Sequence, residues 1–375
     1  MLIRRIAAGL IAAALATPLG LATPGAAAPP GPDAAADVTM SWSTTGSGGI
    51  DLDRADLGEV FTKANRKATY GSDCKVSGLK ANPQVRWCLQ SDDNASANWW
   101  PQGVTSDSDA SDSEDWEGHH GLMVSWYHKG DKGARITLLD TQTKKYRHLL
   151  LVVPDGEGSY APLSLHAGGI VWYGDQLYVA DSYEGVRVFD LNTIWDLTED
   201  PNGDVTDSDK IGKVGDTYYG HGYRYMVPQS GRWQSPEVAD KRCSTSGPIH
   251  NSWMSLDRAA SPHRLVIGEF CSRTEDSTPG RVTAWDMDGL RIDADADGVA
   301  TADNVARLPA VNGAAHGANA QGGATTGGGD WFFSVSRGSN AAGDLYRHQW
   351  TADGWQQQGR KSTPQGNEDL SFRYR

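Results

Sequence analysis

The chain has 375 residues, and its 47 acidic against 34 basic side chains give a formal net charge of −13 at pH 7. This charge makes nucleic acid and anionic membranes poor partners, although an acidic surface also suits solubility outside the cell. The length is enough for one large domain with a substantial core.

The N-terminus has the layout of a secretory signal peptide. Arg4 and Arg5 precede an apolar run from Ile6 to Leu21, and small residues follow. No second apolar run is long enough to span a bilayer. We therefore expect a secreted, extracellular, soluble monomer with no membrane partner. The predicted organisation is a signal peptide (1–28), a flexible leader (29–40) and a single domain (41–375).

One short pattern occurs five times: a polar residue, a turn of small residues, and then a strand. Its first residues are Gln102, His166, His250, Gln321 and Glu368, at intervals of 64, 84, 71 and 47 residues. Short β-branched and aromatic runs bounded by Gly, Asp and Ser, such as GGIVWYG and QLYVADS, follow the openings. The spacing brackets the roughly 40–50 residues of a four-stranded propeller blade with loop insertions.

This pattern predicts an all-β chain that folds as a five-bladed β-propeller. Six or seven blades are the alternative, because the longest interval could hide another blade. The C-terminal NEDLSFRYR is too short for a blade, so we expect it to close the ring with N-terminal strands between Asp37 and Asn98. The best helical pattern, Leu52–Ala68, precedes the blades. Because the first strand of each blade lines the channel, the five opening residues should meet at one channel mouth.

The four cysteines are expected to pair in an exported chain. Of the three possible connectivities we favour Cys74 with Cys88 and Cys243 with Cys271. Cys243 lies just before the strand that His250 opens, and Cys271 lies just after the next strand. The predicted topology places both on one face, so the second pair agrees with the fold.

His166 and His250 are the sharpest pair of candidate functional residues, because they open consecutive blades. Neutral imidazoles bind divalent metals, and the amide oxygens of Gln102 and Gln321 could complete a mixed site at the channel mouth. One histidine could instead act as a general base, or both could bridge blades structurally. Glu368, at the last strand start, could orient an imidazole or only cap a turn.

Arginine and tyrosine candidates accompany the histidines. Arg273 and Arg337 follow second strands, where a guanidinium suits a carboxylate or sulfate group on a ligand. Tyr223 could protonate a leaving oxygen, although its alternation with Tyr225 is more typical of one face of an outer strand.

The segment DADADGVATADN, residues 293–304, resembles a calcium loop. Asp293, Asp295 and Asp297 occupy the first three ligand positions, and Thr301 occupies the ninth. The twelfth position is Asn304, where a bidentate Glu is expected, and an exposed acidic turn is the alternative. A calcium ion bound here would be structural.

The blade pattern, the signal peptide and the closing EDLSF resemble exported β-propeller proteins of actinobacterial type. The outline is also similar to five-bladed arabinanase-like glycosidases, whose mouths carry three carboxylates, whereas here only Glu368 or its neighbour Asp369 fits. Propeller polysaccharide lyases look like a closer chemical match, because they use His, Tyr and Arg, in some families with His and Gln metal ligands.

Together these patterns predict a carbohydrate-active protein with a polysaccharide or glycan as its partner. The favoured function is that of a polysaccharide lyase on an acidic polysaccharide, with an Arg on the uronate carboxylate, His166 or His250 as base, and a Tyr or water as acid. A glycoside hydrolase and a non-catalytic, lectin-like glycan-binding propeller are the alternatives. Fold by itself does not decide between them.

Overall fold

The computed structural model describes residues 38–74, 85–239, 242–272, 278, 280–309, 311, 319–326, 329–338, 341–351 and 353–372. The protein is all-β, with 50% strand and 6% helix, as the sequence pattern predicted. The predicted signal peptide, 1–28, lies outside the described residues. In the described part of the chain, no helix is long and apolar enough to cross a membrane.

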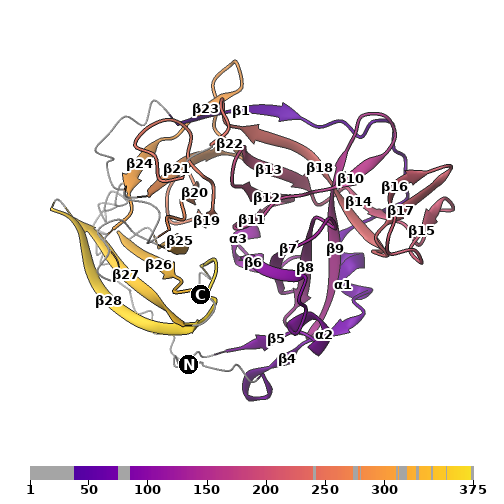
Figure 1. Ribbon diagram of the computed structural model, residues 1–375, viewed down its shortest axis with the longest axis horizontal. Coiled ribbons are helices and arrows are strands. Elements are labelled where there is room, and N and C mark those ends of the chain that lie inside the picture. The colour runs from indigo at the N-terminus through magenta and orange to yellow at the C-terminus, as the bar shows by residue number, and fades with distance from the viewer. Residues whose placement is uncertain are drawn as a thin grey trace, which may run out of the picture.

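The largest sheet is curled until it is nearly closed (Figure 1). Its main path runs in the order β11 (Ile170–Tyr173), β12 (Gln176–Asp181), β13 (Gly185–Asp190), β18 (Tyr225–Gln234), β9 (Lys145–Pro154), β8 (Ala134–Asp140), β7 (Gly121–His128) and β6 (Trp99–Ser106). The two end strands, β11 and β6, contact each other. The sheet also contains six strands off this path: β1 (Thr39–Thr44), β2 (Arg54–Ala55), β3 (Arg66–Lys67), β10 (Tyr160–Pro162), β14 (Ile194–Asp196) and β23 (Val299–Thr301).

A single long strand, β18, joins two four-stranded units into this sheet. Its first half pairs in parallel with β9, and its second half pairs antiparallel with β13. At Gly231 a side chain would collide with the Trp42 ring of β1, since a Cβ atom at this position would lie 2.3 Å from the ring. Glycine therefore lets the Trp42 ring of β1 pack against β18 near the point where β18 changes from β9 to β13 as its partner.

Two further curled sheets and two small ones complete the fold. One contains β19 (Trp253–Asp257), β20 (Arg264–Gly268), β21 (Arg281–Asp288), β22 (Arg291–Ile292) and β24 (Asn304–Arg307). The next is the meander of β25 (Ala320–Thr325), β26 (Asp330–Val335), β27 (Ala342–Thr351) and β28 (Gly354–Gln365). The small sheets are β15 (Gly203–Asp204) with β17 (Thr217–Gly220) and β16 (Ile211–Val214), and β4 (Thr69–Tyr70) with β5 (Trp87–Cys88).

The helices are short: α1 (Leu57–Thr62), α2 (Ser91–Asn94), α3 (Asp107–Ala110) and the 3₁₀ turn η2 (Gly71–Asp73). The helical pattern over 52–68 therefore overestimated the length of α1. The Asp56 carboxylate caps the helix by accepting a 2.7 Å hydrogen bond from the Glu59 amide. Leu57, Val60 and Phe61 are buried, and the chain then leaves the helix to form β3 against β9.

The innermost strands contact one another in chain order around the centre of the molecule (Figure 1). Contacts run from β6 to β11, from β11 to β19, and from β19 to β25. A side chain at Gly103 would lie 2.8 Å from the Ile170 amide, and one at Gly168 would lie 2.0 Å from the Ser252 carbonyl. The glycines that follow Gln102 and His166 are thus needed for the close approach of neighbouring inner strands.

The C-terminal segment closes this circuit of contacts. A side chain at Gly322 would lie 2.6 Å from the Leu370 amide, and the Val104 amide donates to the Asp369 carboxylate at 3.4 Å. The expected pairing with N-terminal strands is not found among the described residues, where β1 pairs with β18 and β23 instead. Val38 and Met40 are buried in the core, so the expected flexible leader does not extend over these residues.

Both predicted disulfides are confirmed: Cys74–Cys88 and Cys243–Cys271. The first links η2 to β5, and the second ties the segment before β19 to the segment after β20. Two disulfides are typical of extracellular proteins.

Candidate functional site

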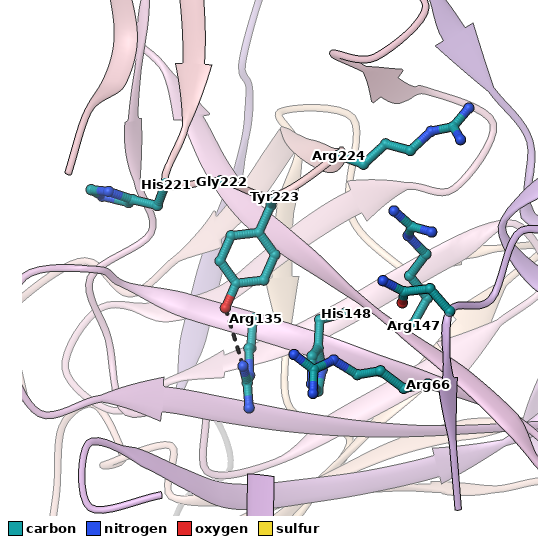
Figure 2. A pocket seen from close by; sticks show the side chains of 9 residues that line it. Arg66, Arg135, Arg147, His148, His221, Gly222, Tyr223 and Arg224 are labelled. Atoms are coloured by element: carbon teal, nitrogen blue, oxygen red, sulfur yellow. Dashed lines mark hydrogen bonds between the residues drawn. The ribbon is translucent and has the colours of Figure 1, made fainter. Parts of the chain in front are cut away.

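Two cavities contain five of the side chains that the sequence singled out. The first, which we call the arginine cavity, has a volume of about 250 Å³ and holds Tyr223 (Figure 2). The second, the channel-mouth cavity, has a volume of about 440 Å³ and lies where the inner strands begin. The structure therefore separates Tyr223, whose hydroxyl accepts a 3.2 Å hydrogen bond from Arg135, from the two histidines.

The channel-mouth cavity brings together the four residues proposed for a metal site. Gln102, His166, His250 and Gln321 all line it. Its other lining residues are Gly168, Ser182, Tyr183, Arg242, Ser252 and Phe270. The wall therefore consists of imidazoles, amides, hydroxyls, two aromatic rings and one guanidinium group.

His166 is positioned by the turn that follows it. Ala167 has a φ of 54°, a left-handed conformation that costs energy for a residue with a side chain. The turn feeds Gly168 and Gly169 into close contact with the start of β19. The His166 ring lies 4.6 Å from the Tyr127 ring, centroid to centroid. Burial lowers the pKa of His166, so its imidazole is neutral at neutral pH and can accept a proton.

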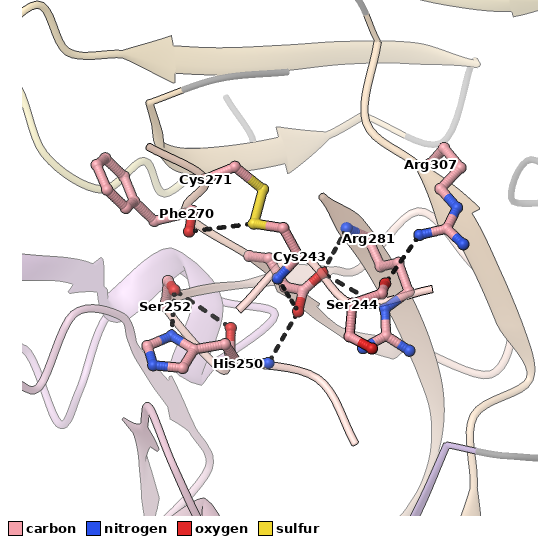
Figure 3. Close-up of a disulfide and its surroundings, with 9 residues drawn as sticks. Cys243, Ser244, His250, Ser252, Phe270, Cys271, Arg281 and Arg307 are labelled. Atoms are coloured by element: carbon pink, nitrogen blue, oxygen red, sulfur yellow. Dashed lines mark hydrogen bonds and ion pairs between the residues drawn. A yellow bond between two sulfur atoms is a disulfide. The ribbon is translucent and has the colours of Figure 1, made fainter. Parts of the chain in front are cut away.

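His250 is held by a buried carboxylate next to the disulfide (Figure 3). Glu269 has no solvent exposure, and its Oε1 accepts hydrogen bonds from the amides of His250 at 3.1 Å and Cys243 at 3.2 Å. Its Oε2 accepts from the Arg281 amide at 2.8 Å, and the Arg281 guanidinium supplies a matching positive charge. The Glu269 carboxylate therefore fixes the backbone that carries His250 relative to Cys243 and Arg281.

The imidazole of His250 has contacts of its own. Its Nδ1 lies 3.2 Å from the Ser252 Oγ, and its ring meets the Tyr183 ring edge to face at 4.9 Å. Tyr183 is 55% exposed, so its hydroxyl is accessible to a ligand in the cavity. Each histidine of the mouth is thus accompanied by a tyrosine.

Neither Glu368 nor Asp369 is among the described residues that line the mouth. Burial raises the pKa of Glu368 to about 8. Burial also raises the pKa of Tyr127, and the nearby Glu368 carboxyl group raises it further. The pKa of Asp369 is raised well above its usual range, again by burial. Both acids are therefore protonated over much of the pH range, which suits hydrogen bonding better than ionic catalysis.

Of the two arginines predicted for the mouth, Arg337 is not among the described residues that line the cavity. Arg337 forms an ion pair with Asp344 at 2.6 Å, and Asp344 also binds Arg360. Arg273 lies outside the described residues. Arg242 lines the cavity, with its guanidinium carbon 5.8 Å from the centroid of the Phe270 ring. Its position next to Cys243 is the sequence signal that could have identified it, because the disulfide brings this segment to the mouth.

The predicted calcium loop forms a tight turn before β23. The Asp295 carboxylate accepts hydrogen bonds from the amides of Asp297 and Val299, both at 2.9 Å. Asp293, Asp297 and Thr301 lie on the same turn and the strand that follows it. In the part of the chain that the structure describes, no three His, Cys, Asp or Glu side chains gather as metal ligands.

Amide oxygens fall outside that set of ligands, so the mixed group at the mouth is a separate case. Two imidazoles and two amide side chains line one cavity.

Comparison with known proteins leaves the site to be interpreted from its chemistry. No protein-family model matches the chain, and no curated protein resembles it in sequence.

Proposed function

We propose that this protein is an exported five-bladed β-propeller whose channel-mouth cavity binds an acidic polysaccharide and cleaves it by β-elimination. Closure of the ring is supported by the circuit of contacts from β6 through β11, β19 and β25 to the C-terminal segment and back to β6, with that segment in the place of the fifth opening. Export is supported by the two disulfides and by the layout of residues 1–28.

The observation that carries the proposed activity is the composition of the cavity wall. A neutral imidazole, a guanidinium and an accessible phenol line the same space, on His166, Arg242 and Tyr183. These are the three groups that elimination from a uronate needs: a base, a carboxylate-binding cation and a proton donor.

The proposed reaction keeps protons and electrons in balance. Arg242 binds the uronate carboxylate, which makes the neighbouring C5 proton more acidic. His166 removes that proton, the electron pair forms the C4–C5 double bond, and the C4–O4 bond breaks. Tyr183 donates a proton to the departing O4, and solvent then restores both side chains to their starting states.

The same wall weighs against a glycoside hydrolase. Hydrolysis of glycosides usually needs two carboxyl groups on either side of the scissile bond. None of the described residues that line the cavity is an Asp or Glu. Glu368 lies near Tyr127 but not in the lining, and its pKa of about 8 suits a neutral acid.

The test is turnover on a panel of polyuronates that differ in sugar and linkage. We expect at least one substrate to give a product with ultraviolet absorbance from the new C4–C5 double bond. Reducing ends that form without this absorbance would mean hydrolysis and would refute the elimination. Arg337→Gln serves as the matched control for Arg242→Gln, because Arg337 is paired with Asp344 and is not among the described residues that line the cavity.

A lectin-like binding function is the second candidate, and one observation favours it. Trp100 is 38% exposed and Tyr183 is 55% exposed, so aromatic faces are available to stack on sugar rings. Saturable glycan binding without any turnover, unchanged by His166→Ala with His250→Ala, would support binding alone.

Two metal sites are further parts of the proposal, and the metal content of the protein tests each of them. As the alternative to a free His166 base, we propose Gln102, His166, His250 and Gln321 as ligands of a divalent ion, since an imidazole nitrogen bound to a metal cannot also accept a proton. We also propose the loop at 293–304 as a structural calcium site. Elemental analysis of the purified protein should then find calcium that persists in His166→Ala and a transition metal that does not. If neither metal is present at stoichiometric levels, both metal sites are refuted.

A further inference from the structure

The arginine cavity is a concentration of positive charge in an acidic protein. Arg66, Arg135, Arg147 and Arg224 all line it, whereas the whole chain has a net charge of −13. They come from β3, β8, β9 and the segment just before β18, so distant parts of the chain supply them (Figure 2). None of the described lining residues is acidic.

Buried carboxylates fix three of these guanidinium groups from outside the cavity lining. Asp93 is 5% exposed and binds Arg135 at 3.0 Å and Arg66 at 3.2 Å. Asp196 is 1% exposed and binds Arg224. Each guanidinium has five N–H donors, so an ion pair on one edge leaves donors for another partner. Three further carboxylates form ion pairs at this group: Asp92 with Arg66 at 2.7 Å, and Glu59 and Glu199 with Arg224 at 3.1 and 3.0 Å.

Arg147 differs from the other three because no described carboxylate pairs with it. Its Nη1 donates a 2.6 Å hydrogen bond to the Lys63 carbonyl. Its guanidinium carbon and that of Arg224 each lie 4.9 Å from the centroid of the Tyr225 ring. Burial lowers the pKa of Arg147, and the neighbouring charges of Arg224 and Arg66 lower it further. An anion in the cavity would relieve this repulsion.

Neutral groups on the wall complete a hydrogen-bonding site. Tyr223 and Asn65 add a hydroxyl and an amide. Burial lowers the pKa of His148 to about 4, so its ring is neutral and adds no charge. A volume of about 250 Å³ accommodates a small oxyanion together with part of a sugar or several waters.

We propose that the arginine cavity is a binding site for a tetrahedral oxyanion, sulfate or phosphate, with Arg147 as the residue that it neutralises. The anion is either a free ion or an ester group on a saccharide, since both present the same charged oxygens to guanidinium groups. This site is independent of the proposed elimination, because it lies in a different cavity and needs no turnover.

The test is calorimetric titration of the intact protein with sodium sulfate and sodium phosphate at constant ionic strength in chloride. We expect saturable one-to-one binding, weakened at least tenfold by Arg147→Gln and much less by Arg147→Lys. Arg347→Gln is the matched control, because Arg347 is exposed and paired with Asp330 on another sheet. Thermal unfolding in chloride alone checks that each variant folds, and Arg147→Lys keeps the test valid if Arg147→Gln does not.

Two outcomes contradict the proposal: no saturable binding by the wild type, or equal affinity in Arg147→Gln and Arg347→Gln. A monosaccharide sulfate and a monosaccharide phosphate, compared with the unmodified sugar, identify the source of the anion. Tighter binding of an ester than of the inorganic ion assigns the site to a modified saccharide, and the reverse assigns it to the free ion. His166→Ala with His250→Ala should leave all these affinities unchanged, which separates this test from that of the proposed function.

Discussion

The two cavities present different chemical groups to a ligand. The channel-mouth cavity offers imidazole, amide and phenol groups with a single guanidinium, whereas the arginine cavity offers four guanidinium groups, two histidines, a phenol and an amide. The first is built from the opening residues of inner strands, and the second from outer strands and the loops beside them. A wall of neutral groups with one cation suits proton transfer on a bound uronate, and a wall of cations suits tight recognition of an anion.

The difference also extends to how each wall is supported. A disulfide and the buried Glu269 hold His250, whereas ion pairs to Asp93 and Asp196 hold the arginines. Changes to one support should therefore leave the other cavity intact.

The largest effect is expected from removing both histidines of the mouth. His166→Ala with His250→Ala should lower turnover about 10²- to 10⁴-fold, the usual contribution of a general acid or base. Oligosaccharide affinity should change much less, because Arg242 and the aromatic residues remain. Initial rates and calorimetric titration measure the two quantities, and unchanged turnover would remove both histidines from the mechanism.

The two disulfides should separate stability from activity. Replacing either pair by serine removes a cross-link, and each change should cost about 3 kcal/mol of unfolding free energy. Only Cys243→Ser with Cys271→Ser should also lower turnover, since that disulfide holds the segment carrying His250. Chemical denaturation and rates at a temperature where both variants are folded make the comparison. Equal loss of turnover in the Cys74→Ser and Cys88→Ser variant would contradict it.

Glu368 should make the mouth sensitive to pH. Its pKa in the folded protein is about 8, above the ordinary value of 4.5, so the folded state holds a proton that the unfolded state releases between these values. Stability should therefore fall as pH rises from about 4.5 to 8. Glu368→Gln should be more stable than the wild type at pH 8 by more than about 1 kcal/mol, and nearly equal to it at pH 4.5. Thermal unfolding across this range would show a constant difference if the carboxyl is not buried.

Tyr223 provides the smallest expected effect and the sharpest contrast. Because it lies in the arginine cavity, Tyr223→Phe should change turnover less than about twofold. Tyr183→Phe, which removes the same hydroxyl at the mouth, should lower turnover at least tenfold. Turnover rates of the two variants, measured side by side, test this difference. A larger loss of turnover in Tyr223→Phe than in Tyr183→Phe would indicate that Tyr223 takes part in the reaction.

The sequence predicted what depends on local pattern and regular spacing. Short β-branched runs predicted the all-β fold, and the small residues after Gln102, His166 and Gln321 predicted how the inner strands begin. Both disulfide pairs followed from cysteine positions relative to the strands. These features depend on residues within a few positions of one another or on a repeated interval.

Other features depend on contacts between distant residues, and the sequence did not show them. β18 pairs first with β9 and then with β13, which requires the edges of these two strands to lie in line with each other. The arginine cavity needs Arg66, Arg135, Arg147 and Arg224 to converge from four segments that share no motif. Arg242 reaches the mouth only through the fold of the disulfide-linked segment. The sequence also did not show that Tyr223 lines the arginine cavity, since strand alternation does not reveal which cavity a side chain faces.

The most direct test of the account is a crystal structure of the His166→Ala and His250→Ala variant with a bound oligouronide. The account predicts sugar density in the channel-mouth cavity, with a uronate carboxylate on Arg242 and a glycosidic oxygen within hydrogen-bonding distance of the Tyr183 hydroxyl. Density for the oligouronide only at another surface, with this cavity holding solvent under saturating ligand, would contradict it.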